Sequence, residues 1–356
     1  MGGHPRLQRR SGGHRDGSAA GVDFAALSMR REPSPVSDLR SLAGAVKLLW
    51  RLRPDVLVYA TPKASLLGSI AGRIARVPRV VYELWGLRLE TAQGVARRVF
   101  AALESTTSRL STLVIANSVS LADRARSLGV TGGRRVIVLG AGSSHGVDSE
   151  FFAPGVEAAA LTPETARRLA ESDRLTVGFI GRIHPDKGID TLIDALRILS
   201  GRGRKVQLLL VGGEDGAVLD DELGQLRDVV PVHIEGFADD VRGALSAMDL
   251  LVLPSRREGF PNVVLEAAAM EIPAVVSDAT GCRDSVVHGV TGRIARTGDA
   301  TSLANEIDVL LEDDELRTKT GRAARENAVR HFSQRDIWAL HSRAWRGDID
   351  AVGPTD

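Results

Sequence analysis

Cysteine is almost absent from this sequence, since Cys282 is the only one among 356 residues. A single cysteine excludes a disulfide within the chain and fits the reducing conditions of the cytoplasm. No apolar run is long enough to span a bilayer, and Met1-Gly2-Gly3-His4 lacks the apolar core of a signal peptide. We therefore expect a cytoplasmic protein.

Metal-binding and nucleophile patterns are also missing. The eight histidines and four methionines are scattered, without the spacing of a metal site. The single Asp-x-Asp, Asp348-Ile349-Asp350, lies in a polar tail where we do not expect a metal. No Ser/His/Asp or Cys/His arrangement is evident, so the sequence predicts neither a bound metal nor a resident cofactor.

The composition is that of a soluble globular protein, with 43% hydrophobic and 26% charged residues, and the length suggests two or three domains. The net charge of +1 hides an asymmetry, because residues 1–150 carry 22 Lys and Arg against 11 Asp and Glu. The remainder carries 24 against 34, so a basic half is joined to an acidic one. The basic half suits an anionic surface or substrate, although solvated arginines would give the same count.

Strands and helices alternate along the first half. Residues 1–20 have almost no apolar content and are predicted to be disordered, and residues 21–29 could form one short strand. Asp38 is the predicted cap of an amphipathic helix that Pro54 ends. Further strands are expected at residues 55–60, 79–84, 112–116 and 135–139, with helices at 66–75, 95–110 and 121–128.

The same alternation restarts after a polar, Ala-rich linker at residues 155–173. Strands are expected at residues 176–180, 206–211, 232–235, 250–253 and 274–277, and the pattern after Thr301 is helical. This predicts an α/β fold of two Rossmann-like doubly wound domains facing a cleft. The predicted boundaries are residues 21–154 for the N-terminal domain, 174–330 for the C-terminal domain, and 331–356 for a last helix and tail.

The first domain lacks an expected opening. A doubly wound domain should open with a strand, a Gly-containing loop and a helix, but nothing before Val22 has strand character. The sequence therefore predicts an incomplete N-terminal domain, either because that unit is absent or because translation begins upstream of Met1.

Two carboxylates frame the stretch REGFPNVVLE, in which Glu258 follows an apolar strand and Glu266 lies in the next helix. Gly259 loosens the backbone, and Pro261 suits the opening turn of a helix. The amides of Val263 and Val264 are predicted to point at an anion, because helix N-termini favour phosphate. A simpler alternative is that helix-start glutamates merely complement the dipole and Glu266 faces water.

A second pattern places two cations at the end of the first strand of the second domain. Gly181-Arg182 follows that strand, and Asp186-Lys187-Gly188 opens the next helix. Nucleotides bind at this edge of doubly wound sheets, where Arg and Lys suit phosphate. Either cation alone would be interpreted as solvated.

Four segments in order and spacing resemble the retaining glycosyltransferases of family 4, which have the GT-B fold. These are GRIHPDKGIDTLIDAL, VGG, MDLLVLPSRREGFPNVVLEAAAM and GCRD…GVTGRI. The first half is similar to a bacterial group that acts on lipid-linked or surface-polysaccharide intermediates, through TPKASLLGSIAGRIARVP, WGLRLET and GAGSSHGVD among others.

The resemblance implies a hexosyltransferase-type enzyme that moves a sugar from a nucleotide-sugar, expected to be UDP-linked, to a glycan or lipid-linked acceptor without a metal. The residues implied as catalytic are Arg182 and Lys187 on the donor diphosphate and Glu258 on the donor sugar. The residues implied as donor-binding are Gly181, Gly236, Phe237, Gly259, Phe260, Asn262, Val263, Val264 and, on the ribose, Glu266.

Three positions depart from the family pattern. The opening strand and glycine loop are missing, Trp85 stands before Gly86 where many relatives have His, and His145 replaces the usual Asn before Gly-Val-Asp. Lys63, on a strand-end loop, is a candidate ligand of an acceptor phosphate or a surface lysine.

Two alternatives remain open. A catalytically impaired nucleotide-sugar-binding protein would bind nucleotide without turnover, and a sugar-nucleotide epimerase would convert donor without acceptor. The epimerase needs a histidine in the cleft, and the sequence offers only His184 and His233. We expect no nucleic-acid partner. An anionic membrane surface is a further candidate partner, since the basic half has a helix end with Trp50, Arg51 and Arg53.

Overall fold

The computed structural model describes Asp23, residues 25–27, Met29 and residues 34–157, 161–213 and 220–348. Most of the predicted tail and opening region lies outside these residues, so the missing opening unit stays a prediction. The short strand predicted at residues 21–29 is not formed at Asp23, residues 25–27 or Met29.

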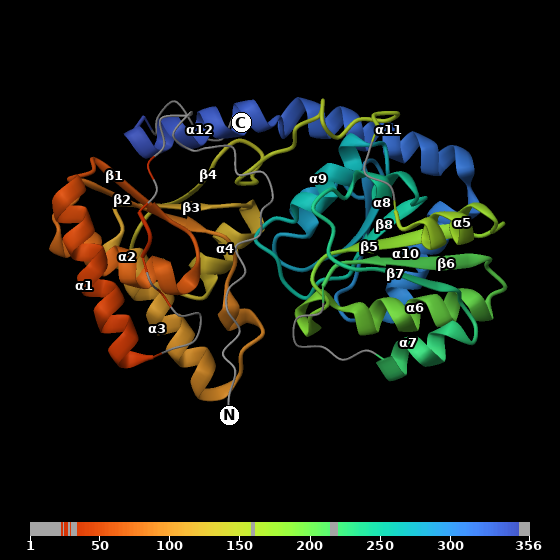
Figure 1. Cartoon of the computed structure of the whole chain (residues 1–356), viewed down its shortest axis with the longest axis horizontal. Helices are drawn as coiled ribbons and strands as arrows, with labels where there is room; N and C mark the ends of the chain where they lie inside the picture. The colour runs from red at the N-terminus through yellow and green to blue at the C-terminus, as the bar shows by residue number, and fades with distance from the viewer. Residues whose placement is uncertain are drawn as a thin grey trace.

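Two α/β domains stand side by side, each built on a wholly parallel sheet (Figure 1). The N-terminal sheet has the order β1-β2-β3-β4. Its strands are β1 (Val56–Tyr59), β2 (Arg79–Leu84), β3 (Leu113–Ala116) and β4 (Val136–Val138), and its helices are α1 (Pro35–Leu52), α2 (Pro62–Ile74), α3 (Gly94–Leu110) and α4 (Val119–Ser127). The short helix η2 (Arg88–Glu90) precedes α3.

The C-terminal sheet has six strands in the order β10-β9-β8-β5-β6-β7. They are β5 (Leu175–Ile180), β6 (Val206–Val211), β7 (Val232–Glu235), β8 (Leu250–Leu253), β9 (Ala274–Ser277) and β10 (Gly292–Ala295). The helices that follow β4 in the chain are α5 (Pro163–Ala170), α6 (Ile189–Gly201), α7 (Asp220–Arg227), α8 (Arg242–Ser246), α9 (Asn262–Ala269), α10 (Ala300–Glu312), α11 (Asp314–His331) and α12 (Gln334–Arg346), with short helices η3 (Pro185–Lys187) and η4 (Arg283–Ser285).

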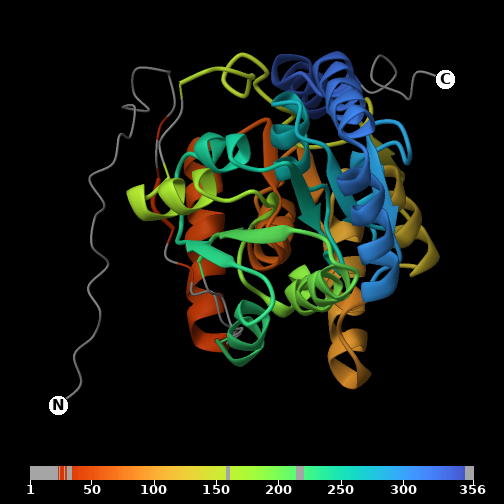
Figure 2. The same cartoon turned by 90° about the vertical axis from the view of Figure 1, so that its right-hand side faces the viewer.

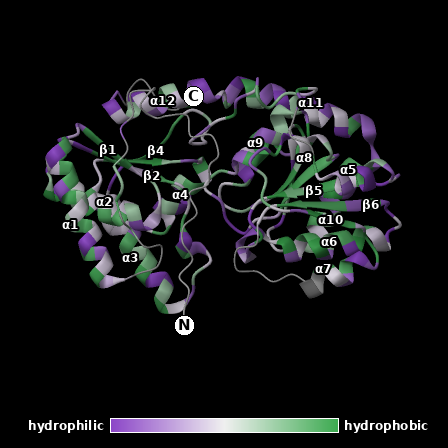
Figure 3. Ribbon diagram, in the orientation of Figure 1, coloured by the Kyte–Doolittle hydropathy of each residue, from purple (hydrophilic) through white to green (hydrophobic). Residues whose placement is uncertain are grey.

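Continuous apolar runs explain the central strands of this sheet. Every residue of β6, β8 and β9 is buried, as expected for parallel strands covered on both faces. Figure 3 shows the strands as predominantly hydrophobic ribbons, while hydrophilic residues gather on the outer sides of the helices. The predicted fold of two doubly wound domains is confirmed.

Several predicted boundaries differ from the structure. Ser34 is the N-cap of α1 and Pro35 its first residue, so the prediction of Asp38 as the cap was wrong. Asp38 lies in the first turn, where its carboxylate accepts the Ser34 N–H (3.1 Å) and pairs with Lys63 of α2 (2.5 Å). The predicted linker contains a helix, α5, with Pro163 in its first turn.

The last helix belongs spatially to the first domain. After α11, which packs on α9, the chain returns and α12 lies along the N-terminal domain (Figure 1). Leu340, Ala344 and Trp345 of α12 pack against strand residues such as Val81 and Ile115. The described chain therefore crosses between the domains twice.

The two crossings are bonded to each other. The Val147 N–H donates to the Phe332 carbonyl oxygen (2.7 Å), and the Gln334 N–H donates to the Val147 carbonyl oxygen (3.0 Å). Val147 and Phe332 also share one apolar cluster with Phe260 and Leu265 of the second domain. The outgoing and returning segments thus form one connection.

A buried acid fixes α12 on the first sheet. The Oε1 atom of Glu83, on β2, accepts the indole N–H of Trp345 (2.7 Å) and lies 3.0 Å from Nδ1 of His341. Glu83 and His341 are both buried, and the other carboxylate oxygen of Glu83 is buried without a partner in the described part of the chain. This carboxylate therefore depends on the two α12 side chains.

Replacing His341 by Leu should lower the free energy of unfolding by about 3–5 kcal/mol, because it leaves a buried carboxylate with one partner fewer. Urea denaturation followed by circular dichroism measures the loss. His331→Leu, at an exposed position near the end of α11, is the matched control and should change stability by less than about 0.5 kcal/mol. Equal effects of the two substitutions would show that the Glu83 cluster does not hold α12.

Candidate functional site

The second sheet reverses its strand order at β5, which lies between β6 and β8. Chain segments leaving the carboxyl ends of β5 and β8 therefore diverge, and doubly wound folds bind ligands in the crevice at such a switch point. The segment after β5 carries Arg182 and Lys187, and the segment after β8 carries Glu258 and leads into α9. The two motifs singled out in the sequence thus flank one switch point.

Lys187 and Glu258 meet there. Nζ of Lys187 lies 2.5 Å from Oε1 of Glu258, and their side chains are only 18% and 16% exposed. The Ser255 hydroxyl donates to the same carboxylate oxygen (2.8 Å). Because both charges are largely withdrawn from water, their mutual attraction exceeds that of a surface pair. The structure therefore places a preorganised cation at the carboxyl edge of β5 and β8.

Gly188 lets the segment after β5 approach the segment after β8. Its φ of +67° is in the left-handed region, and a Cβ there would collide with the carbonyl oxygen of Pro254. A side chain would push the β5 segment away from the β8 segment. The position of Lys187 against Glu258 thus follows from a glycine immediately after it.

The Glu258 loop is enclosed by both domains. The Glu258 N–H donates to the Thr280 carbonyl oxygen (2.9 Å), in the segment after β9. On the other side, Gly259 lies against the backbone of Trp85 and Gly86 from the first domain, so closely that a Cβ on Gly259 would overlap the Trp85 carbonyl. The first domain therefore forms a wall beside the loop.

Polar contacts join the same surfaces. Asp284 accepts both the backbone N–H (3.0 Å) and the hydroxyl of Ser120 at the start of α4. Glu90 accepts the hydroxyl of Thr280 (2.7 Å), and the Arg257 guanidinium donates to the hydroxyl of Thr91 (3.1 Å). Sequence reasoning assigned no role to these residues, although Glu90, Thr91 and Asp284 lie in the motifs WGLRLET and GCRD.

A hydrogen-bonded chain continues from the first domain to α9. The Ser143 hydroxyl donates to Oδ1 of Asn262 (3.1 Å), so the amide nitrogen of Asn262 faces Nδ1 of His145 (3.3 Å). An amide nitrogen only donates, so Nδ1 accepts and the neutral ring carries its proton on Nε2. Burial lowers the pKa of the imidazole, as does nearby His341, which favours this neutral form. Trp85 packs on the His145 ring, with centroids 5.6 Å apart.

Glu266 is half-buried in α9, and its carboxylate has no hydrogen-bond partner among the described residues. Burial raises the pKa of its carboxyl to about 7. Because the Glu266 side chain is only half-buried, the alternative that it faces water stays open. A half-buried acid without a hydrogen-bond partner suits a ligand that brings hydroxyl groups.

Two predicted contacts need correction. The N–H of Val264 donates to the Pro261 carbonyl oxygen (3.1 Å), so this amide is not free for an anion as predicted. Phe260 is buried in an apolar cluster and stacks on Phe332, with ring centroids 5.3 Å apart. Its side chain therefore packs in the core. The prediction failed because the apolar sequence around Phe260 did not show which residues pack against the returning chain.

The remaining predicted residues lie at the carboxyl edge of the second sheet, outside the Lys187–Glu258 pair. Gly181 and exposed Arg182 follow β5, and the Gly181 N–H donates to the Val211 carbonyl oxygen (2.9 Å) at the end of β6. Gly236 and the exposed Phe237 follow β7. Asn262 and Val263 begin α9. Their ligand contacts stay predictions.

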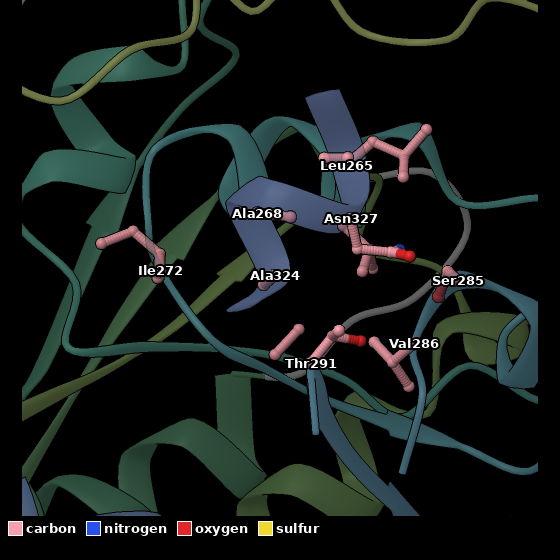
Figure 4. Close-up of a pocket in the computed structure, with 11 residues that line it drawn as sticks. Leu265, Ala268, Ile272, Ser285, Val286, Thr291, Ala324 and Asn327 are labelled. Atoms are coloured by element: carbon pink, nitrogen blue, oxygen red, sulfur yellow. The ribbon is translucent and has the colours of Figure 1, made fainter. Parts of the chain in front are cut away.

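A small hollow between α9 and α11 is separate from this site (Figure 4). Figure 4 shows a mainly aliphatic lining, with Ser285, Thr291 and Asn327 as its labelled polar side chains. Lys187, Glu258 and Glu266 are not among its lining residues.

Two family models match the chain. Residues 162–327 match "Glycosyl transferases group 1", and residues 5–141 match "Glycosyl transferase 4-like domain". The capsular polysaccharide biosynthesis glycosyltransferase CapM of Staphylococcus aureus is 34% identical over 315 residues, which are 88% of this chain and 82% of CapM. The chain belongs to the glycosyl transferase group 1 family. It is a glycosyltransferase with the GT-B fold.

Other proteins similar to this glycosyltransferase include an N,N'-diacetylbacillosaminyl-diphospho-undecaprenol alpha-1,3-N-acetylgalactosaminyltransferase of Campylobacter jejuni. It is 27% identical over 85% of this chain and 80% of its own length. Among solved structures, Anabaena HepE in complex with UDP has a TM-score of 0.69 and 26% identity, covering 88% of this chain and 84% of HepE. A sucrose-phosphate synthase of Thermosynechococcus elongatus (TM-score 0.75, 22% identity, 91% and 81% covered) shares the fold.

Glu266→Gln should remove a pH dependence of the glycosyltransferase's stability near pH 7. The folded-state pKa of about 7 lies above the usual value of about 4.3. The folded chain therefore binds this proton more tightly, and stability falls as pH rises from about 5 to about 7. Gln is always neutral. The melting temperature of the variant should therefore rise relative to that of wild type as the pH increases from about 5 to about 7.

Thermal denaturation of both proteins at several pH values between about 5 and 8 measures this difference. Glu150→Gln, at an exposed position, is the control and should run parallel to wild type. A difference between Glu266→Gln and wild type that stays constant with pH would contradict the raised pKa.

Proposed function

We propose that this enzyme transfers a hexose from a UDP-sugar to a glycan or lipid-linked acceptor, with retention of configuration and without a metal. The observation that carries the proposal is the Lys187–Glu258 pair at the switch point between β5 and β8. HepE structures with UDP, with UDP and glucose, and with UDP-glucose support a UDP-sugar donor. The Campylobacter relative and a UDP-Gal:alpha-D-GlcNAc-diphosphoundecaprenol alpha-1,3-galactosyltransferase of Escherichia coli support a lipid-linked acceptor.

The donor diphosphate lies between the β5 segment and the start of α9 in this proposal. Lys187 and Arg182 contact its oxygens, and the N-terminal amides of Asn262 and Val263 add partial positive charge. Glu258 accepts hydrogen bonds from hydroxyl groups of the donor sugar while it holds Lys187 in place. Glu266 accepts the ribose hydroxyls, and Gly236 and Phe237 border the base.

The acceptor attacks the anomeric carbon of the donor sugar from the same face as the departing leaving group. The acceptor hydroxyl oxygen bonds to the anomeric carbon as the bond from that carbon to the diphosphate oxygen breaks. The hydroxyl proton passes to the departing diphosphate, which leaves as UDP. Charge grows on the diphosphate during this step, so preorganised cations stabilise the transition state more than the ground state. No protein nucleophile is required.

The two alternatives make different predictions. An epimerase would convert the UDP-sugar when no acceptor is present, and an impaired binding protein would hold UDP without releasing it from any donor. His184 accepts the Asp186 N–H (3.1 Å), and His233 is buried on β7. The His184 carbonyl oxygen accepts the Lys187 N–H (2.9 Å), but neither histidine side chain is hydrogen-bonded to Lys187 or Glu258 in the described residues. His145 is the histidine that lies at the start of α9. Incubation with UDP-sugars, with and without lipid-linked acceptors, distinguishes all three functions.

Lys187→Ala should lower kcat by about 10²–10³, because it removes a preorganised charge that faces the leaving group. Release of UDP from a saturating UDP-sugar measures the rate. Lys205→Ala is the matched control, since Lys205 is 68% exposed and pairs with Asp173 at the surface. Its rate should stay within about twofold of wild type. A loss below about threefold for Lys187→Ala would place the diphosphate elsewhere.

The product anomer and metal dependence test the rest of the proposal. Proton NMR of the product should show the anomeric configuration of the donor sugar. Turnover should persist in EDTA, because two cations and a helix N-terminus supply the positive charge. An inverted anomer would overturn retention, and loss of activity in EDTA that Mg²⁺ restores would overturn metal independence.

A further inference from the structure

Helix α3 carries an apolar stripe that no other described part of the chain covers. Val95, Val99 and Leu103 are 75%, 48% and 39% exposed. They are spaced four residues apart and so lie along one face of the helix. The opposite side supplies Phe100 and Ala101 to the domain core. In Figures 1 and 2 the first turns of α3 project beyond the body of the N-terminal domain.

The exposed charges of α3 have one sign. Arg97, Arg98 and Arg109 are exposed, whereas the only acid of the helix, Glu104, is buried and accepts the hydroxyl of Tyr82 (2.6 Å). Arg98 and Arg109 therefore lie along one edge of the apolar stripe, and Arg97 lies on the far side of the helix. This is the pattern of a helix that lies in the interface of an anionic bilayer, with its apolar side chains below the headgroups.

In the sequence, the stripe begins just after residues that contact the second domain beside the Glu258 loop. Thr91 accepts a hydrogen bond from Arg257, the residue before Glu258, and α3 starts at Gly94. Glu90 is joined to Thr280 of the second domain in the same segment. A bilayer bound at the start of α3 would therefore lie near the segment that borders the Glu258 loop.

We propose that the Val95–Val99–Leu103 stripe is the surface by which this enzyme docks on an anionic membrane. The inference rests on the proposed lipid-linked acceptor, whose lipid would stay in that bilayer. A second copy of the chain fits the surface less well, because a symmetric contact would bring two sets of arginines together. None of the helices in the described part of the chain is long and apolar enough to cross a membrane.

The test compares α3 with the helix end singled out in the sequence. Trp50 and Leu52, near the end of α1, are 58% and 57% exposed beside Arg51. Val95→Asp/Val99→Asp and Trp50→Asp/Leu52→Asp change the net charge equally and replace two exposed apolar side chains each. Co-sedimentation with vesicles of phosphatidylglycerol and phosphatidylcholine measures binding, and vesicles of phosphatidylcholine alone test the need for anionic lipid.

Wild type should sediment with the anionic vesicles and less with phosphatidylcholine alone. The α3 variant should lose at least about tenfold in partitioning, and the α1 variant less than about threefold. Unchanged circular dichroism and turnover of a water-soluble acceptor show that each variant is folded and active. If wild type transfers sugar from no UDP-sugar to any glycan or lipid-linked acceptor, the proposed function fails while the vesicle comparison still stands.

Four results would overturn the docking surface. The first is wild type that does not bind anionic vesicles, and the second is an α3 variant that binds as wild type does. The third is loss of binding in the α1 variant alone, which would move the surface to the Trp50 end. A wild-type dimer in sedimentation velocity that the α3 substitutions dissociate would assign the stripe to a second copy instead.

Discussion

The pairing of Lys187 with Glu258 is the constraint on which the site depends. The two residues come from segments that leave neighbouring strands of the sheet, and each is placed by the backbone beside it. Gly188 permits the close approach to Pro254, and Gly259 permits the approach of Trp85 from the first domain. A cation held by a carboxylate needs little reorganisation when an anionic leaving group develops. The pair that joins the two segments therefore also presents the positive charge that the proposed reaction needs.

Much of this arrangement could be predicted because local patterns determine it. The apolar runs that form β6, β8 and β9 are buried on both faces, so their composition alone indicates central parallel strands. The positions of Lys187 and Glu258 follow from the rule that ligands gather at the carboxyl ends of such strands. The start of α1 was misjudged because two helix-start signals, Ser34-Pro35 and Asp38, lie close together.

Contacts between distant segments could not be predicted from the same patterns. Nothing local in Phe260 shows that it packs on Phe332, and nothing in Glu83 shows that α12 returns to cover it. The chain from Ser143 through Asn262 to His145 joins residues more than a hundred positions apart, so it emerges only once both domains are assembled. The contacts of Asn262 also join the first domain to the start of α9, which borders the site.

The bonded crossings at Val147 and Phe332 have a mechanical consequence. Because both covalent connections pass through one hydrogen-bonded point, they can act together as a single pivot rather than as two independent tethers. Rotation about that point would open or close the contacts of Ser120 with Asp284 and of Glu90 with Thr280, which lie in other parts of the interface. Sliding of one domain along the other would instead break the pivot. A hinge-like rotation about that point is therefore the domain motion that would leave both connections intact.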